Sequence, residues 1–404
     1  MFPQFWLALL AVAWLYWIWR TYRWQRRAIC KRSYPAALER YPSVSVIRPI
    51  KGLDTGIDKN IRAALDHGYP GEVETLFVFE DRREPVLPTV EQALAERQQA
   101  GQSVNARILF AGLPPANRTG KLHSMIEGLK ASKNEVVAFV DSDVRQDRKA
   151  LRVLVETLLA SDRAGAAFAP VIYTESPMTV GDVGHALMVN GLYEPAALAK
   201  AGEFGGELPF IMGHFMVFKR EAIEAIGGLE SAEGQLVDDM FLGRRLTECG
   251  YHNRMSPHPV AIVQRGSTVR EFIQTFTRWI AFSKSGLPVL SFKLQYGLLG
   301  AAFWGGLILA LWAVSAGHLL AALLAALIPL SITAMINDLH HRMAGVPLPL
   351  KYYWVSLALW LIAPLVYVYI LTKHEITWRG RRYRLNTEAR LARQHDDRTP
   401  RAQM

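Results

Sequence analysis

Acidic side chains follow β-rich segments of the sequence at positions where they could hold a metal ion and a diphosphate. Glu80 and Asp81 follow residues 75–79, and Asp141-Ser142-Asp143 follows residues 136–140. A hard divalent cation such as Mg²⁺ or Mn²⁺ is typically bound by one or two carboxylates together with substrate phosphates. Asp141 and Asp143 are therefore the predicted metal site. Capping of a loop or a helix is the alternative role for these acids and for Asp81.

A basic residue lies between these two segments, in the stretch Asn117-Arg-Thr-Gly-Lys121. The stretch lacks the full spacing of a P-loop and is not interpreted as one. Lys121, next to a glycine turn, could still contact a diphosphate. A solvated surface lysine is the alternative.

Two further carboxylates open a predicted helix. Asp238 and Asp239 precede the apolar run 240–242, and Gly250 marks the end of the helix. An acid at a helix start is often a cap, and Asp238 is a candidate for that role. Adjacent carboxylates near a diphosphate also repel one another, which keeps a base available near neutral pH.

Residues 270–279 predict an amphipathic helix just before the C-terminal apolar segments. Gln274 and Arg278 are four residues apart and share one face, whereas Phe272, Phe276 and Trp279 suit an interface. This helix is expected to place a cation and an indole at the junction of domain and bilayer. A helix that only rests on the membrane is the alternative.

An α/β sheet is the element expected to position these residues. Short β-rich segments at 44–49, 75–79, 107–110 and 136–140 alternate with helical patterns such as 90–99 and 121–130. This alternation predicts a mostly parallel sheet covered on both faces. Ligands of such sheets bind beyond the carboxyl ends of the strands, so the acids are expected at one edge.

Apolar segments flank this domain. Residues 2–19 are nearly free of charge and are followed, not preceded, by basic residues. This order indicates a retained anchor rather than a signal peptide, with the next region in the cytoplasm. Three more apolar stretches occupy 296–314, 319–336 and 352–371. Three spans would put the basic residues 379–384 outside, so either one stretch is re-entrant or interfacial, or the positive-inside tendency fails here.

The composition agrees with a folded protein that contacts a membrane. Half of the residues are hydrophobic, a fifth are charged, and the net charge is +10. Disorder is excluded by this apolar content, and two cysteines are too few for a disulfide framework. The basic clusters directly follow apolar runs, which indicates anionic headgroups and no nucleic acid as their partner.

We divide the chain accordingly, in the order of the sequence. The parts are an N-terminal anchor (1–20), a basic linker (21–40), a cytoplasmic catalytic domain (41–265), interfacial helices (266–290), a C-terminal transmembrane bundle (291–372) and a basic segment with a tail (373–404).

The motifs resemble inverting glycosyltransferase family 2 in order and spacing. They are the strand that begins Val44-Ser-Val-Ile-Arg-Pro, Asp81, Asp141-Ser-Asp143, Asp238-Asp239-x-x-Leu-Gly-x-Arg-Leu and Arg278-Trp279. Two local signatures, Arg48-Pro-Ile-Lys-Gly52 and Thr377-Trp-Arg-Gly-Arg-Arg-Tyr-Arg-Leu385, are similar to segments of ceramide glucosyltransferases. The resemblance extends from the anchor to about Leu385.

This resemblance implies an A-type glycosyltransferase fold (nucleotide-diphospho-sugar transferase, Rossmann-like) with one N-terminal and about three C-terminal membrane helices. It implies transfer of glucose from UDP-glucose to a lipid hydroxyl, ceramide foremost, to give a β-glucosyl lipid such as glucosylceramide. A multi-pass protein of a bacterial inner membrane is expected. The implied roles are Asp81 near the uridine, Asp141 and Asp143 at the diphosphate and metal, Lys121 at the phosphates, Asp239 as base, and Arg278 with Trp279 at the end of the Q/R-x-x-R-W motif.

The sequence departs from that motif at one position. Thr275 occupies the place of the first polar residue, and Gln274, one residue earlier, can reach the same helix face. The alternative function is therefore transfer to another lipid, such as a hopanoid polyol, with UDP-N-acetylglucosamine as donor. His214 and Asp238 are candidates for contacting or supporting the acceptor, and a structural histidine is the alternative for His214. A catalytically inactive scaffold is a rival, although it predicts missing strand-end acids.

Overall fold

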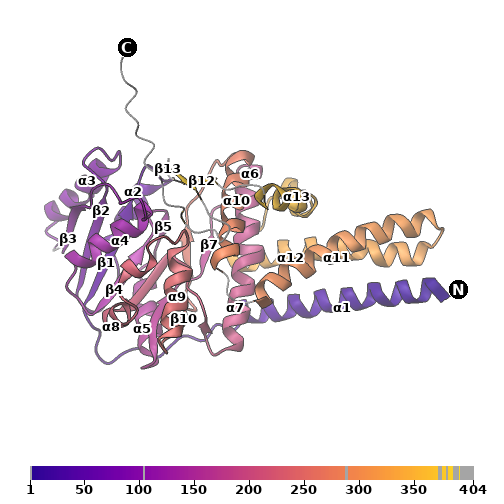
Figure 1. The fold of residues 1–404 in the computed structure, drawn as a ribbon, viewed down its shortest axis with the longest axis horizontal. Coiled ribbons are helices and arrows are strands. Elements are labelled where there is room, and N and C mark those ends of the chain that lie inside the picture. The colour runs from indigo at the N-terminus through magenta and orange to yellow at the C-terminus, as the bar shows by residue number, and fades with distance from the viewer. Residues whose placement is uncertain are drawn as a thin grey trace, which may run out of the picture.

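The computed structural model describes residues 2–102, 105–286, 290–371, 375–378, 381–384 and 391. An α/β domain lies at one end of the molecule, and long helices extend from it on one side (Figure 1). The N-terminus lies at the far end of these helices. Most of the predicted tail lies outside the described residues.

The domain is built on an eight-stranded sheet with the order β3-β2-β1-β4-β9-β6-β10-β8. Strands β1, β2, β3 and β4 run parallel, as do β6 and β10, whereas β9 is antiparallel to both of its neighbours and β8 to β10. The sheet is therefore mostly parallel, as predicted, but it is mixed, because β9 and β8 run against the other strands. A buried run such as 215–218 is apolar in either direction, so its sequence does not reveal the reversal. The bounds are β1 Val44–Ile50, β2 Val73–Phe79, β3 Ala106–Phe110, β4 Val136–Val140, β6 Ala164–Phe168, β8 Glu207–Leu208, β9 Phe215–Lys219 and β10 His252–Met255.

Helices cover both faces of this sheet. Alternate residues of β1 point to opposite faces, so Ile47 packs in a different core cluster from Val46. Helices α4 (Gly120–Ala131), α8 (Arg220–Ala225) and α9 (Asp238–Glu248) cover the face of Ile47. Helices α2 (Ile57–Ala64), α3 (Leu87–Gln99) and α5 (Ala150–Leu159) cover the other.

A smaller sheet lies next to the end of β4. Its order is β5-β11-β7, with bounds Val144–Arg145, Val260–Ile262 and Val171–Tyr173. Because β5 begins directly after Asp143, this sheet fixes where the Asp141–Asp143 turn leaves the main sheet. A short 3₁₀ turn, η2 (Leu229–Ala232), precedes α9.

Two long helical segments lie between the domain and the extended helices. One is the continuous run α6 (Val180–Ala186), η1 (Leu187–Tyr193) and α7 (Glu194–Glu203), in which η1 is a π-helical turn. The other is α10 (Val269–Gly286), the predicted amphipathic helix. Gly184 lets α6 approach α10 closely, because a Cβ there would lie 2.8 Å from the ring of Phe272.

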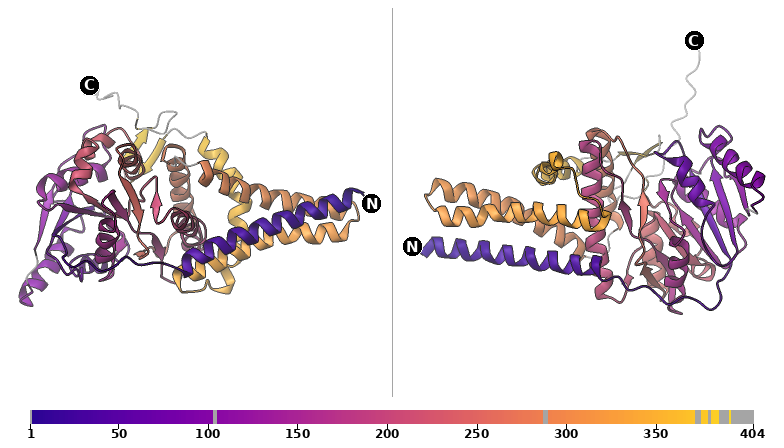
Figure 2. Two further views of the ribbon diagram at one scale, coloured as in Figure 1. Left: turned by 90° about the horizontal axis from the view of Figure 1, so that it is seen from below. Right: turned by 180° about the vertical axis from the view of Figure 1, so that it is seen from behind.

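The extended helices are α1 (Phe2–Cys30), α11 (Leu290–Ser315) and α12 (Leu319–Ala344). Within the described residues, Tyr296–Ser315 and Leu319–Ala344 are long and apolar enough to cross a membrane. The third predicted C-terminal span forms η3 (Leu350–Tyr352) and α13 (Trp354–Leu371). Helix α13 lies across the long helices rather than along them (Figure 2).

The C-terminal segment returns to the α/β domain as a hairpin of β12 (Glu375–Trp378) and β13 (Arg381–Arg384). The Arg381 guanidinium lies 2.7 Å from the carboxylate of Glu80, at the end of β2. Further along, the backbone N–H of Leu391 donates to the carbonyl of Gly234, shortly before α9. The end of the described chain therefore contacts both sides of the strand-end region.

Candidate active site

A buried arginine orders the turn that carries Asp141 and Asp143. Arg48 in β1 is 1% exposed, and its Nη2 donates to the carbonyls of Asp141 (2.9 Å) and Val144 (2.7 Å). Burial lowers the pKa of Arg48 to about 10, while the nearby carboxylates oppose that shift, so the group stays charged at neutral pH. The Arg48 guanidinium thus fixes the turn through its backbone carbonyls, and its positive charge offsets the negative charge of Asp141 and Asp143.

The side chain of Asp143 has an unused acceptor. Its Oδ1 is buried and has no hydrogen-bond partner among the described residues. No group of three His, Cys, Asp or Glu side chains is arranged for a metal within that same part of the chain. Mg²⁺ and Mn²⁺ in diphosphate sites need only one or two carboxylates, since phosphate oxygens and water complete the shell. Asp143, with Asp141 beside it, therefore fits such a cation.

Lys121 joins three parts of the strand-end region. Its Nζ lies 2.6 Å from Oδ1 of Asp141 and donates to the carbonyl of Gly213 at 2.9 Å. Burial lowers the pKa of Lys121, but Asp141, Asp238 and Asp239 outweigh it and raise the pKa above its usual value. The lysine is therefore a cation among three carboxylates, and the solvated-lysine alternative does not describe it.

Asp239 packs directly against the same loop. A Cβ on Gly213 would lie 2.5 Å from Oδ2 and 2.9 Å from Cβ of Asp239, so only glycine fits beside this carboxylate. Burial raises the pKa of Asp239 to about 7, and repulsion from Asp238 adds to the shift. A carboxyl group with such a pKa can accept a proton near neutral pH.

Asp238 supports the start of α9. Its Oδ1 accepts from the backbone N–H of Asp239 at 3.0 Å, and its side chain is 5% exposed. Burial raises its pKa as well, and its Oδ2 has no hydrogen-bond partner among the described residues. The N-cap of α9 is Val237 and makes no side-chain cap hydrogen bond, so Asp238 is the first residue of the helix and not its cap. It is a second carboxyl group at the site.

His214 and α10 lie between the strand-end acids and the long helices. The backbone carbonyl of His214 accepts from Asp141 N–H at 2.9 Å, because His214 lies opposite Asp141 where β9 begins. Burial lowers the pKa of His214, and its ring lies 6.1 Å from that of Trp279. Arg278 is close enough to act electrostatically on His214 and on Tyr173. The structure thus brings α10 to the strand-end acids.

Two predicted site residues lie further out. Asp81 is at the same edge of the sheet, but its half-exposed carboxylate pairs with Arg83 at 2.7 Å. Gln274 is exposed on α10, one turn before Arg278. Within the described part of the chain, neither side chain makes a hydrogen bond or an ion pair with Lys121 or Asp239, so both lie outside the central cluster.

Several residues of this region were not predicted from the sequence. Arg48 carried a signal, because a charged side chain in a buried strand needs a partner. Tyr173 carried no such signal. It lies in β7 of the small sheet, close to Asp143, and its hydroxyl donates to Gln264 at 2.9 Å. Arg381 reaches Glu80 across 301 residues of sequence, a separation that no local pattern reveals.

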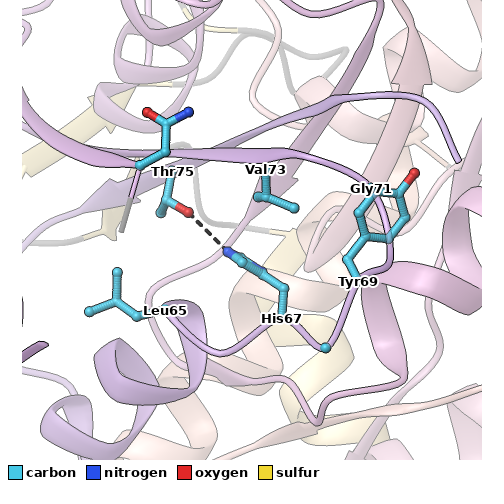
Figure 3. Close-up of a pocket in the computed structure, with 8 residues that line it drawn as sticks. Leu65, His67, Tyr69, Gly71, Val73 and Thr75 are labelled. Carbon is cyan, nitrogen blue, oxygen red and sulfur yellow. Dashed lines mark hydrogen bonds between the residues drawn. The ribbon is translucent and has the colours of Figure 1, made fainter. Parts of the chain in front are cut away.

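A cavity of about 210 Å³ lies elsewhere on the domain, by the amino end of β2 (Figure 3). His67 lines it and is already bonded to Thr75 and Gln146, at 2.9 and 2.8 Å. The strand-end acids belong to the opposite, carboxyl edge of the sheet, so this cavity does not belong to their site.

The fold is shared with a solved glycosyltransferase. The mannosyltransferase PcManGT of Pyrobaculum calidifontis, solved in complex with GDP-Man and Mn²⁺, aligns with a TM-score of 0.51 at 19% identity. The alignment covers 91% of this chain and 99% of that chain. At this identity the likeness establishes the fold alone.

Sequence relatives narrow the class. Ceramide glucosyltransferase 3 of Caenorhabditis elegans is 23% identical over 85% of this chain and 73% of its own length. Ceramide glucosyltransferase 1 of the same organism is 23% identical over 62% of this chain and 51% of its own length. The sequence profile of glycosyl transferase family 21 matches residues 5–391.

The mixed α/β sheet and these relatives together define a glycosyltransferase of the A type. The chain belongs to glycosyl transferase family 21, and it is similar to the ceramide glucosyltransferases, as the resemblance implied.

Proposed function

We propose that this protein is a membrane-bound inverting hexosyltransferase that moves glucose from UDP-glucose to the hydroxyl of a membrane lipid, ceramide in the first place. The observation that carries the proposal is the packing of Asp239 against Gly213, whose carbonyl also binds Lys121 beside Asp141. The proposed proton acceptor, Asp239, and the proposed phosphate-binding cation, Lys121, thus contact the same residue, Gly213. The names of the relatives support the donor and the acceptor.

The reaction is a single displacement. Asp239 takes the proton from the lipid hydroxyl, whose oxygen forms a bond to the anomeric carbon on the face opposite the nucleotide. The bond from that carbon to the diphosphate oxygen breaks, and UDP leaves with the electron pair. Attack from the opposite face converts the α-linked donor into a β-glucoside, so no covalent sugar–enzyme intermediate forms.

Fixed charges stabilise the departing UDP. Lys121 and Arg278 are cations next to the position where negative charge builds up, and Arg48 holds the acidic turn in place. Asp143 and Asp141 would hold Mg²⁺ or Mn²⁺, which supplies further neutralisation of the diphosphate when bound. Asp81 would lie toward the uridine.

The membrane arrangement follows from the same contacts. We assign α1, α11 and α12 as spans and α10 and α13 as helices at the cytoplasmic surface. Arg381 binds Glu80 of the catalytic domain, so the C-terminal hairpin must lie on the same side of the membrane as that domain. An interfacial α13 therefore removes the conflict with the positive-inside tendency.

The alternative acceptor is a hopanoid polyol, with UDP-N-acetylglucosamine as donor. Thr275 supports it, because this residue replaces the polar group that begins the motif on α10. Position 275 is half-buried, whereas Gln274 is exposed, so the two side chains do not face the same surroundings.

The decisive experiment pairs both donors with both acceptors in nanodiscs. Wild type should form a β-glucosyl lipid from UDP-glucose and ceramide, identified by mass and by its anomeric proton coupling. Asp239→Asn should lower kcat by about 10²- to 10⁴-fold, while the exposed Asp58→Asn on α2 should keep wild-type activity. Product from only the second donor–acceptor pair would replace ceramide by the polyol. Full activity of Asp239→Asn would remove Asp239 as the base.

A further inference from the structure

A π-helical turn places an aromatic ring between the candidate active site and the membrane helices. The turn η1 ends at Tyr193, whose ring lies 5.6 Å from that of Trp279 in α10 and 5.4 Å from that of Tyr296 in α11. All three side chains are half-buried. π-helical turns are rare and are frequently found at functional sites.

At one end the rings meet the carboxylates. On its other side, the ring of Trp279 lies next to that of His214, with 6.1 Å between the ring centroids. The carbonyl of His214 accepts from Asp141 N–H, and its neighbour Gly213 contacts Asp239. We call the four side chains Tyr296, Tyr193, Trp279 and His214 the aromatic row.

At the other end the row begins in the membrane segment. Tyr296 is the first residue of the apolar span Tyr296–Ser315, and its hydroxyl donates to the carbonyl of Leu192 in η1 at 3.2 Å. This bond ties the start of the span to the π-helical turn. The row thus extends from the edge of the bilayer segment to the proposed base.

The chemistry of the row suits one kind of ligand. Aromatic side chains combine a large apolar surface with a polar edge, and they are favoured where one end of a ligand is apolar and the other is hydrated. The Nδ1 of His214 is buried and has no hydrogen-bond partner among the described residues. A polar group of a ligand could therefore form a hydrogen bond with it at the end of the row near Asp239. A lipid alcohol fits both ends, with chains beside α11 and its hydroxyl toward Asp239.

We propose that the aromatic row is the path along which the lipid acceptor enters, and that Tyr193 and Tyr296 are specificity-determining residues for it. The inference rests on the proposed transfer to a lipid hydroxyl. It adds a route from the bilayer to the base, and it adds two residues on elements that the motif on α10 does not include. The headgroup lies against Tyr193 and Trp279, while the tails stay in hydrocarbon.

Separate measurements of donor and acceptor test this path. Tyr193→Leu and Tyr296→Leu should each raise the apparent KM for the lipid, expressed as mole fraction in nanodiscs, by about three- to tenfold. The KM for UDP-glucose and the Kd for UDP should not change. Tyr193→Phe keeps the ring and should behave as wild type. Trp304→Leu is the matched control, because Trp304 lies in α11 outside the row and its indole N–H donates to Trp360.

A packing role gives a different result. If the rings only seat α10 and α11 on η1, the leucine variants will change donor and lipid parameters together and lower Tm. That outcome, or an unchanged lipid KM in folded variants, would overturn the path.

A photoreactive lipid alcohol separates this inference from the proposed reaction. Cross-links to peptides that contain Tyr193 or Tyr296, abolished by excess unlabelled lipid, would support the row even if no sugar is transferred. Sugar transfer with cross-links confined to other helices would keep the reaction and reject the row.

Discussion

At the scale of single residues, Gly213 and Asp239 pack so closely that no side chain fits at position 213. A methyl group on Gly213 would meet both Cβ and Oδ2 of Asp239. Gly213→Ala should therefore displace the proposed base and lower kcat by at least about tenfold, with an unchanged fold. The measurement is kcat together with Tm; Gly202→Ala, at a position with open space around it, is the control. An active Gly213→Ala variant would show that the carboxylate has another productive position.

Asp239 also gives a prediction for pH dependence. Burial, followed by repulsion from Asp238, raises its pKa to about 7, and the base must be ionised to act. Activity should therefore rise with pH up to about 7 and then level off. A profile that levels off near pH 4, the usual range of an exposed carboxyl, would contradict the raised pKa.

The same shift has the opposite effect on stability. A carboxyl group with a raised pKa holds its proton more tightly in the folded state, so its contribution to stability falls as pH rises from about 4 to about 7. Asp239→Asn cannot ionise. Its Tm relative to wild type should therefore be higher at pH 8 than at pH 5.

At the scale of elements, the C-terminal hairpin completes the strand-end region. Arg381 pairs with Glu80, which also binds Lys51, and a Cβ on Gly120 would lie 3.7 Å from the Arg381 guanidinium. Arg381 thus lies next to the residue that precedes Lys121. It brings positive charge to the side of the region where we propose that the nucleotide binds.

We expect Arg381→Ala to raise the KM for UDP-glucose by about three- to tenfold, since one charge-assisted contact near the diphosphate is lost. The KM for the lipid should change little. Arg384→Ala is a close control, because Arg384 lies on the same strand and pairs with Glu375 of the hairpin itself. Equal effects of both substitutions would point to hairpin stability rather than to donor binding.

Sequence reasoning located the acids but not their partners. Asp141 and Asp239 could be placed because strand ends and helix starts have local signals. The contact of Lys121 with Gly213 depends on β9 entering antiparallel to β4, and strand direction leaves no local trace in an apolar run. Tyr193 could not be placed either, since a π-helical turn differs from an α-helix only in that its backbone hydrogen bonds span one more residue, which leaves no recognisable sequence pattern.

At the scale of the whole molecule, hydropathy predicted the apolar helices but not their orientation. Residues 352–371 are apolar enough to resemble a span, yet α13 crosses the long helices, and Val366 packs against Leu236 and Val237 just before α9. The length and composition of an apolar segment determine its free energy of transfer into lipid. They do not give the direction of the helix, which tertiary packing decides.

The proposed arrangement makes a topological prediction. A fluorescent protein fused after Arg384 should fluoresce in the cytoplasm, whereas alkaline phosphatase fused there should be inactive. In the α11–α12 turn, at Gly317, alkaline phosphatase should be active. The reverse pattern at Arg384 would require a different path for α13, and would conflict with the contact between Arg381 and Glu80.

The way in which α1 meets the domain has a consequence for what can be glycosylated. This helix continues without a break for 29 residues, pairs with α12 through Tyr22 and Asp338, and is followed by Arg32, which donates to Pro257 of the domain. The anchor is therefore not a flexible tether, and in the proposed arrangement the proton acceptor has a set height above the hydrocarbon. A lipid whose free hydroxyls stand one sugar further out would overshoot that level. We expect the enzyme to add one sugar per lipid and to release the product rather than extend it.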